Sequence, residues 1–547
     1  MTGAERVSVA IVGAGPVGTT AANLLGGYGV DTLIIDQEPD IVAYPRAIGV
    51  DDESLRTFQS AGLADEVLRT AIQNVPLKFF DAAGRCLADI RPTRRDLGWH
   101  KRNIFMQPTA EAVLRRGLER FPHVRTGFGT RLLELEQDED GVSLLVTDRL
   151  GEARQVRADY VIAADGGRSP VRGLLGIPLE GSTHPRKWVV IDCAADPLDA
   201  PYTALHCDPR RPYVCARLPD DHRRWEFMLF PGEDAEEMLA PDRVNLLLSR
   251  HLEDADSAQV LRARVYTHHS RIAARFVEGR VALAGDAAHL MPPWAGQGLN
   301  TGIRDAANLC WKLAAIVRGQ ADPSLLATYD EERRPHAKAM IELSDTLGRI
   351  LAPRRRSVAR VRDLVLRAAS AAPAVRAWIL EMRFKPAPDY RDGFVARAGE
   401  GGDPPGVGRM LPQPMVETAD GEQVRLDEVL GPWFAILGFG CDPLARLTGD
   451  ERDAAHRFRP RVVKVVESRA GARHRGQPCA SRDSLVVEDV DNHLRPWFRA
   501  HGRDIALVRP DRCVAALTDP DGLGPTLSSL SHRLGGPRPS YVRGGVP

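Results

Sequence analysis

The strongest constraint on this chain is a glycine-rich turn close to its N-terminus. The apolar run VSVAIV ends at Gly13, and Gly15 and Gly18 complete a G-x-G-x-x-G spacing before a small-residue segment with helical spacing. A second apolar run, TLIIDQ, follows and contains Asp36 near its end. Strand, tight turn, helix and strand within about 30 residues indicate a βαβ unit with parallel strands.

The same spacing predicts a nucleotide cradle. Gly13 allows the tight turn, Gly15 lets the backbone approach a pyrophosphate, and Gly18 lets helix and strand pack closely. Amides at the helix N-terminus favour the phosphates. Asp36 can accept hydrogen bonds from both ribose hydroxyls. The motif therefore predicts dinucleotide binding, but it does not by itself separate FAD from NAD.

Two later segments indicate that the bound dinucleotide is FAD. YVIAADGGRSPVRG places Asp165 and Gly166 at the end of a strand, and RVALAGDAAHLMPPWAGQGLN places Gly285 and Asp286 at the end of another, ahead of a long helix. Three motifs in this order resemble those of the para-hydroxybenzoate hydroxylase class of flavin monooxygenases. The resemblance implies tightly bound, non-covalent FAD. Since no second G-x-G-x-x-G stands in a βαβ context, NADH would bind transiently along a cleft, with NADPH less expected.

The resemblance also implies contacts at individual positions. Asp286 would bind the ribityl chain, and the amides of Leu299 and Asn300 would lie beside a ring carbonyl, where a helix N-terminus stabilises negative charge on reduced flavin. Arg46 and Gln107 match two further contacts, with an exposed ion pair and a helix cap as the structural alternatives. The predicted cofactor residues are Val12, Gly13, Gly15, Pro16, Val17, Gly18, Asp36, Gln37, Arg46, Gln107, Asp165, Gly166, Ala284, Gly285, Asp286, Pro292, Gly298, Leu299 and Asn300, with Ser169 and Arg172 for NADH.

Further stretches resemble one family within this class, the 3-(3-hydroxyphenyl)propionate hydroxylases. They include PRAIGVDDESLRTFQSAGL, RRWEFMLFPGE and YDEERRPHAKAMIELS, so the similarity runs over nearly the whole chain. The resemblance implies a cytoplasmic bacterial enzyme of aromatic catabolism. It would insert one atom of O2 ortho to the hydroxyl of 3-(3-hydroxyphenyl)propionate or 3-hydroxycinnamate. A hydroxylase of a polyketide, resorcinol or chlorophenol, and a flavoprotein oxidase or dehydrogenase, are the alternatives.

Phenol activation favours a general base, because a phenolate ring is the better nucleophile. Asp51, Asp52 and His289 are the candidates: related phenol hydroxylases hold an acid near the Asp51 position, and His289 adjoins the G-D motif. A helix N-cap and a structural histidine are the alternatives. An arginine would suit a carboxylate tail. The predicted substrate residues are Arg210 or Arg211, Tyr213, Trp225 and Phe227, for which surface and core roles are the alternatives.

The order of the segments predicts a mixed α/β and α+β architecture. We expect a Rossmann-like FAD-binding domain at residues 1–185 and 276–345, interrupted by a substrate-binding β-sheet domain at 186–275. A helical segment and linker at 346–400 would lead to a thioredoxin-like C-terminal domain at 401–547. The sequence therefore predicts one discontinuous catalytic unit followed by an appended domain.

Composition excludes several classes of function. Lys plus Arg and Asp plus Glu both number 73, so a nucleic-acid partner is not expected. No apolar run approaches the roughly 20 residues of a membrane helix. The eight cysteines form no C-x-x-C pair, and Cys441 has no second cysteine beside it, so we expect neither a metal site nor dithiol chemistry. The expected partners are a small aromatic substrate and O2, with a homodimer as the candidate assembly.

Overall fold

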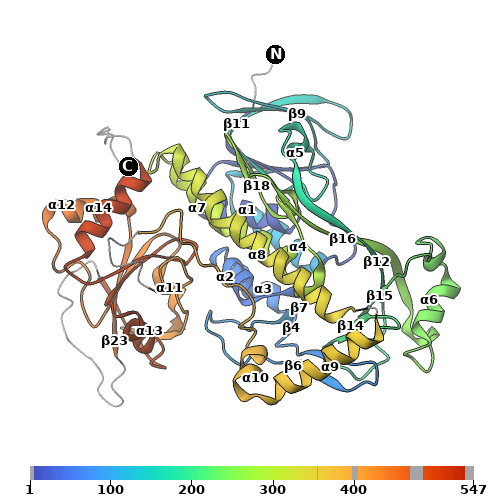
Figure 1. The fold of residues 1–547 in the computed structure, drawn as a ribbon. Coiled ribbons are helices and arrows are strands. Elements are labelled where there is room, and N and C mark those ends of the chain that lie inside the picture. The colour runs from blue at the N-terminus through green and yellow to red at the C-terminus, as the bar shows by residue number, and fades with distance from the viewer. Residues whose placement is uncertain (1–4, 354, 397–404, 468–483, 536–547) are drawn as a thin grey trace.

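The computed structural model of the chain describes residues 5–353, 355–396, 405–467 and 484–535. In Figure 1 the long helix α8 (Ala327–Leu351) runs diagonally across the molecule. The C-terminal part, orange to red, lies on one side of it, and the long strands β12 (Leu179–Cys193) and β16 (Val260–Ala273) extend on the other. The mixture of parallel and antiparallel sheets confirms the predicted fold class.

The N-terminal sheet is built around parallel strands, as the glycine motif predicts. Its path is β17-β18-β11-β1-β2-β8, and the antiparallel strands β9 and β10 extend it from β11. Parallel strands end at the same edge, so the three motif turns meet there. The strands are β1 (Glu5–Val12), β2 (Thr32–Asp36), β8 (Val124–Phe128), β9 (Arg131–Gln137), β10 (Val142–Thr147), β11 (Ala153–Ala163), β17 (Val277–Glu278) and β18 (Val281–Leu283).

Helices cover the apolar faces of this sheet. The helix after the glycine turn, α1, packs against α4 and α7, and a small sheet of order β3-β7-β4 borders this part. The elements are α1 (Pro16–Gly27), α2 (Asp52–Ser60), α3 (Ala64–Leu68), α4 (Gln107–Gly117), α5 (Pro170–Leu174), α7 (Gly298–Val317), β3 (Gly49–Val50), β4 (Ile72–Gln73) and β7 (Asn103–Ile104).

A second eight-stranded sheet has the order β19-β16-β12-β15-β14-β13-β5-β6. Two of its strands, β5 and β6, come from the stretch that the sequence analysis placed with the FAD-binding part. The parallel pairing of β5 with β13 joins residues far apart in sequence, which local patterns do not reveal. The helix α6 (Pro241–Leu248) covers one face. The remaining strands are β5 (Leu77–Phe80), β6 (Cys86–Ile90), β13 (Thr203–His206), β14 (Tyr213–Arg217), β15 (Arg223–Met228) and β19 (His289–Leu290).

The C-terminal part has a seven-stranded sheet of order β21-β20-β24-β23-β22-β25-β26. Strands β22, β23 and β24 are parallel, β25 pairs antiparallel with β22, and β26 pairs antiparallel with β25, the arrangement expected of a thioredoxin-like domain. The elements of this part are β20 (Met415–Thr418), β21 (Gln423–Arg425), α11 (Leu426–Leu430), β22 (Ala435–Phe439), α12 (Gly449–Phe458), β23 (Arg461–Glu467), β24 (Ser484–Asp489), α13 (Leu494–His501), β25 (Ile505–Val508), β26 (Val514–Thr518) and α14 (Leu523–Leu534). The helices α9 (Arg356–Ala371) and α10 (Pro373–Leu380) precede it and pack against β6 of the second sheet.

Buried contacts join the C-terminal part to the helices of the first sheet. Trp311 on α7 and Phe434 form an edge-to-face pair with ring centroids 5.4 Å apart. Arg56 on α2 donates two 2.7 Å hydrogen bonds to the carboxylate of Asp427, and both side chains are almost inaccessible to solvent. The appended domain therefore shares a core with the catalytic unit.

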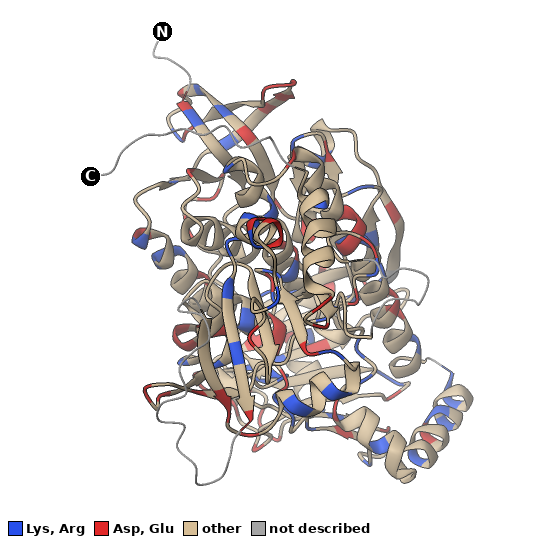
Figure 2. Cartoon of the chain, turned by 90° about the vertical axis from the view of Figure 1, so that its left-hand side faces the viewer, with Lys and Arg blue, Asp and Glu red and all other residues tan. Residues whose placement is uncertain are grey.

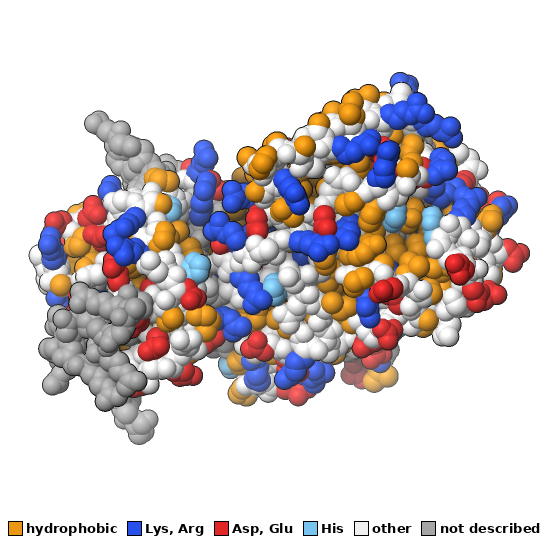
Figure 3. Space-filling view, turned by 90° about the horizontal axis from the view of Figure 1, so that it is seen from below, with side chains coloured by type: hydrophobic (Ala, Val, Ile, Leu, Met, Phe, Trp, Pro, Cys, Tyr) orange, Lys and Arg blue, Asp and Glu red, His pale blue; other side chains and the backbone are white. Residues whose placement is uncertain are grey.

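The surface carries both signs of charge. Figure 2 shows basic and acidic residues intermixed over the elements, as the balanced composition predicts. Figure 3 shows the underside, where hydrophobic and basic side chains lie side by side. On α9 and α10 the exposed apolar side chains include Val361, Leu364 and Trp378. Among the described residues no helix is both long and apolar enough to span a membrane.

Candidate active site

All three sequence motifs meet at one cavity of about 440 Å³. It lies at the carboxyl edge of the N-terminal sheet and extends onto one face of the second sheet. The predicted cofactor residues that line it are Gly15, Pro16, Val17, Arg46, Gln107, Gly166, Ala284, Asp286, Gly298, Leu299 and Asn300. The others, Val12, Gly13, Gly18, Asp36, Gln37, Asp165, Gly285 and Pro292, are not among the residues that line the cavity.

The glycine turn leaves open space where a phosphate would have to sit. Gly13 has φ 103°, and a Cβ added there would clash with the carbonyl of Ala164. A Cβ on Gly18 would clash with the carbonyl of Gly13. A Cβ on Gly15, in contrast, would meet no atom within 4 Å. The backbone of Gly15 therefore faces free space at the N-terminus of α1, which fits a pyrophosphate.

Asp36, at the end of β2, holds the glycine turn in place through hydrogen bonds. The carboxylate of Asp36 accepts hydrogen bonds from the backbone N–H of Ala14 at 2.6 Å and of Glu38 at 2.8 Å. Gln37 is exposed and contacts only the side chain of Glu38, at 3.4 Å. Asp36 thus holds the turn against the end of β2, a role compatible with ribose binding.

The D-G segment contains a buried acceptor atom without a partner. Asp165 accepts from the N–H of Val171 through Oδ2 at 2.9 Å, whereas its Oδ1 is buried and has no hydrogen-bond partner. Burial raises the pKa of this carboxyl. Ser169 caps α5 by accepting from the N–H of Arg172, whose guanidinium donates to the carbonyls of Gly167 and Ala287. Neither Ser169 nor Arg172 lines the cavity, so their assignment to NADH gains no support from this geometry.

The G-D segment offers a carboxylate directly to the cavity. Asp286 follows β18 and opens into the cavity, and the surrounding protein raises its pKa through desolvation. Gln107 contributes differently: its Oε1 accepts from the N–H groups of Arg46 and Ala47 at 3.1 and 2.7 Å. Gln107 therefore positions the Arg46 loop beside the cavity instead of acting as a helix cap.

The N-terminus of α7 points its first amides at the same cavity. Gln297 precedes the helix without a side-chain cap, which leaves the amides of the first turn open to a ligand. Asn300 fixes this helix end, because its Oδ1 accepts from the N–H of Asp51 and its Nδ2 donates to the carbonyls of Gly49 and Gly296. A positive helix end is therefore locked against the segment that enters α2.

Asp51 caps α2, and its carboxylate forms ion pairs with two cations. Its carboxylate accepts from the N–H of Ser54 at 2.9 Å and pairs with Arg304 and Lys385, each at 2.7 Å. Although burial alone would raise it, Lys385 and Arg304 hold the pKa of Asp51 well below its usual range. Asp51 is thus a poor proton acceptor, and the helix-cap alternative fits it better than general-base catalysis.

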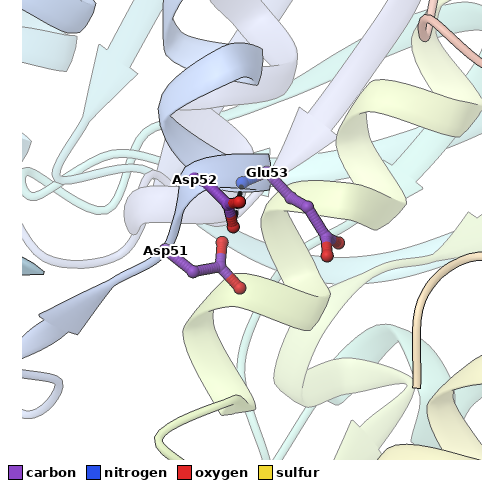
Figure 4. A group of neighbouring side chains, drawn as sticks. All are labelled: Asp51, Asp52 and Glu53. Atoms are coloured by element: carbon purple, nitrogen blue, oxygen red, sulfur yellow. Dashed lines mark hydrogen bonds between the residues drawn. The ribbon is translucent and has the colours of Figure 1, made fainter. Parts of the chain in front are cut away.

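The neighbouring acids complete this cluster. Figure 4 shows the carboxylates of Asp51, Asp52 and Glu53 gathered at the start of α2. Glu53 pairs with both Arg304 and Lys385. Burial raises the pKa of Asp52 to about 7, but Asp52 does not line the cavity. The cluster is therefore a charge-compensated anchor for α2.

His289 also lies off the cavity. It is buried, and its Nε2 lies 2.7 Å from Oδ2 of Asp305, which pairs in turn with Arg333. A base must reach the proton that it removes. The geometry supports the structural alternative for His289.

The predicted substrate residues Tyr213 and Phe227 lie on the face of the second sheet opposite the cavity. Side chains alternate along a strand: Val214, Arg224 and Glu226 line the cavity, whereas Tyr213 and Phe227 point to the opposite face. The latter two, with Trp225, stack among themselves and with His251 beneath α6. Arg210 is exposed and bonded to Asp208, and Arg211 pairs with Glu233.

The cavity-facing side of the sheet contains titratable groups that sequence reasoning missed. Glu226 lies there, and burial raises its pKa. His268 stacks on Trp188 with ring centroids 5.7 Å apart, and burial lowers the pKa of His268 to about 3, so it is neutral at physiological pH. Alternation along RRWEF would have found Glu226, had the inward face been known. The apolar lining, as we call it, comprises Leu77, Phe79, Ile90, Trp188, Leu205, Val214 and Phe384.

Comparisons with known proteins agree with this geometry. A family model described as an FAD binding domain matches residues 6–344, and one described as the HcaD C-terminal domain matches residues 408–533. A relative from Burkholderia vietnamiensis, named 3-(3-hydroxy-phenyl)propionate/3-hydroxycinnamic acid hydroxylase 2, is 54% identical; the alignment covers 95% of each chain. A Klebsiella pneumoniae hydroxylase with the same name, except for the final number, is 47% identical, over 97% of this chain and 95% of that protein.

Solved structures show the same overall fold. The flavin-dependent monooxygenase PieE, in complex with FAD and substrate, aligns with a TM-score of 0.77 at 24% identity, covering 96% of this chain and 99% of that one. At this identity the likeness concerns the fold alone. It extends through both the nucleotide-binding part and the C-terminal part.

Proposed function

Because this chain belongs to the family of FAD-dependent aromatic monooxygenases, we propose that it hydroxylates 3-(3-hydroxyphenyl)propionate. The oxygen atom enters ortho to the phenol hydroxyl and gives a catechol, with 3-hydroxycinnamate as a second substrate and NADH as the reductant. The names of relatives 54% and 47% identical to the chain support this substrate class. The oxidase or dehydrogenase alternative does not fit the family.

One observation carries the proposal: the nucleotide motifs and the apolar lining share a single cavity. A flavin held at the motif end therefore has an aromatic-sized, largely apolar space beside it. When bound, FAD supplies electron transfer from NADH and the activation of O2. The apolar lining excludes water, which limits the loss of reducing equivalents as peroxide.

Particular residues would hold the cofactor. The open space at Gly15 and the start of α1 suit the pyrophosphate, and Asp36 suits the ribose. Asp286 and the unpartnered Oδ1 of Asp165 offer polar acceptors at two strand ends. The amides of Leu299 and Asn300 at the positive end of α7 suit a negatively charged ring.

Phenol activation needs a group other than those the sequence indicated. Asp51 is held as an anion by Arg304 and Lys385, and His289 does not reach the cavity. Glu226 faces the cavity and burial raises its pKa, which makes its carboxylate a stronger proton acceptor than an exposed glutamate. We assign the general base to Glu226.

A panel of phenols tests the proposed substrate. Purified holoenzyme is mixed with NADH or NADPH and with 3-(3-hydroxyphenyl)propionate, 3-hydroxycinnamate, resorcinol, a chlorophenol or phenol. Product mass and peroxide are measured alongside NADH oxidation. We expect coupled formation of a catechol only with the two acids, and faster turnover with NADH. Coupled hydroxylation of a different phenol, with only peroxide from the acids, would contradict the proposal.

The biological setting follows from this chemistry. Conversion of a phenolic acid to a catechol prepares the ring for cleavage, so we place the enzyme in aromatic catabolism in the bacterial cytoplasm. A homodimer remains a prediction.

A further inference from the structure

We propose that Arg102 binds the carboxylate of the substrate, so that the cavity selects phenols with an acidic side chain. This inference rests on the proposed function, because it names the residue that recognises the acid end of that substrate. It replaces Arg210 and Arg211, whose side chains pair with Asp208 and Glu233 away from the cavity.

The backbone around Arg102 places it at the junction of the two halves of the cavity. In the pairing of β3 with β7, Gly49 lies opposite Ile104 and Val50 opposite Asn103. Arg102 directly precedes β7 and Asp51 directly follows β3, and both residues line the cavity. The β3 segment is tied to the N-terminus of α7 by Asn300. Arg102 is thus one strand away from the helix end assigned to the flavin ring.

The other neighbour of Arg102 leads to the apolar lining. Its Nε donates to the carbonyl of Val75 at 3.1 Å, and the N–H of Val75 donates back to the carbonyl of Arg102 at 3.1 Å. Two residues after Val75, Leu77 begins β5 and lines the cavity, as does Phe79. A phenol ring against this lining would have its side chain within reach of the guanidinium.

Arg102 also lacks the acidic partner that three of the other four cations on the cavity have. Five cationic side chains line the cavity: Arg46, Lys101, Arg102, Arg224 and Lys385. Lys385 pairs with Asp51 and Glu53, Arg224 pairs with Asp192, and Lys101 lies 3.6 Å from Asp96 and 3.7 Å from Glu381. Within the described part of the chain, Arg102 forms no ion pair, and its two terminal nitrogens have no hydrogen-bond partner.

Arg46, the other cavity arginine without an ion pair, belongs to the cofactor end. Burial raises the pKa of Asp286 and of Glu111, and the positive charge of Arg46 opposes part of that rise in both. No acid shifts the pKa of Arg102 in the same way: desolvation alone lowers it, to about 10, so Arg102 stays protonated at neutral pH. A desolvated, unpaired guanidinium is costly. A ligand carboxylate would offset that cost through two parallel hydrogen bonds.

The test compares an acid with its neutral isostere. Binding of 3-(3-hydroxyphenyl)propionate and of 3-(3-hydroxyphenyl)propanamide to the holoenzyme is followed by the change in flavin absorbance, and kcat and KM are measured for both. In Arg102→Met we expect the Kd of the acid to rise by roughly 10- to 100-fold, the contribution of a charge-assisted pair. The Kd of the amide should change by less than about threefold.

Two further variants make the result specific. Arg102→Lys keeps the charge but not the planar fork, so it should recover part of the preference for the acid. Arg94→Met removes an exposed arginine that pairs with Asp96 and does not line the cavity, and it should leave both ligands unaffected. If Arg102→Met fails to retain flavin, the ratio of the Kd of the acid to the Kd of the amide is measured in Arg102→Lys and Arg102→Gln instead.

The outcomes separate this inference from the proposed function. Equal losses for acid and amide in the Arg102 variants, in an enzyme whose wild type hydroxylates the acid, would overturn the role of Arg102 and leave the function standing. A wild type that neither binds nor hydroxylates the acid would overturn both.

Discussion

Two glycines of one turn face different surroundings. At Gly13 the backbone has φ 103° and an added Cβ clashes with the carbonyl of Ala164, whereas at Gly15 the same atom meets free space. Gly13 is therefore needed to form the turn, and Gly15 is needed only when a ligand fills the space beside it.

Exchanging each glycine for alanine should separate these roles. We expect Gly13→Ala to lower the free energy of unfolding by about 2 kcal/mol or more, because it combines a positive φ with a backbone clash. Gly15→Ala should change stability by less than about 1 kcal/mol but weaken FAD binding by roughly tenfold or more. Urea unfolding of the apoprotein and flavin titration measure the two quantities. Equal loss of stability in both variants would contradict this division.

The assignment of the base to Glu226 predicts a change in the pH profile. Burial raises the pKa of Glu226, so kcat should rise as pH increases through that pKa and the carboxylate forms. Glu226→Gln should reduce kcat at pH 7 by roughly 100-fold and remove this limb of the profile. Glu233→Gln, which alters a carboxylate off the cavity, is the matched control. An unchanged limb in Glu226→Gln would exclude Glu226 as the base.

At the scale of elements, the end of α7 depends on one side chain. Asn300 bonds to the N–H of Asp51, to the hydroxyl of Ser54 and to the carbonyls of Gly49 and Gly296. These contacts join α7 to β3 and α2, the elements on either side of the expected ring site. Asn300 therefore fixes the position of the N-terminus of α7 relative to β3 and α2, where the flavin ring would bind under the proposed function.

Removal of that side chain should uncouple NADH oxidation from hydroxylation. We expect Asn300→Ala to lose about 2 kcal/mol of stability, since it leaves buried polar groups unpaired. The fraction of NADH that ends as peroxide should rise by about threefold or more, because a loosened helix end admits water. Asn245→Ala, on α6 and bonded only to Asp256, serves as control. Full coupling in Asn300→Ala would argue against this role.

Sequence patterns predicted the elements better than their orientation. The G-x-G-x-x-G turn, Asp165 and Asp286 fall at strand ends that meet because parallel strands share an edge. Alternation in RRWEF predicts two faces, but which face points inward depends on α6 and on the parallel pairing of β13 with β5. The sequence therefore could not show that Phe227 lies in the buried cluster beneath α6, on the face opposite the cavity. The unpaired state of Arg102 was equally hidden, because it depends on which acids fold beside it.

For the whole molecule, buried charge joins the C-terminal domain to the catalytic unit. Glu332 on α8 accepts hydrogen bonds from Arg509, near the β25-β26 hairpin, at 2.8 and 2.7 Å, and pairs with Lys312 on α7. All three side chains are buried. Although burial alone would raise it, Arg509 and Lys312 lower the pKa of Glu332 to about 2.

This shift predicts how stability depends on pH. A carboxyl group whose pKa is lowered on folding stabilises the folded state at pH values above 4.5, its ordinary pKa. This stabilisation is lost as the pH falls towards 2 and the carboxylate becomes protonated. The difference corresponds to about 3 kcal/mol at neutral pH. In urea unfolding at pH 7, Glu332→Gln should have a free energy of unfolding lower than that of the wild type by about this amount. The difference between the two proteins should narrow below pH 4.5. A loss of the same size at every pH would show that the effect is steric.

The two faces of the second sheet can evolve separately. Its strands β14 and β15 give alternate positions to the ligand and to the packing beneath α6. Replacements at Val214 can therefore alter what the enzyme accepts, while Tyr213, Trp225 and Phe227 beneath α6 keep the scaffold intact. Successive substitutions at cavity-facing positions of these strands can therefore change substrate specificity during evolution while the opposite face keeps the fold stable.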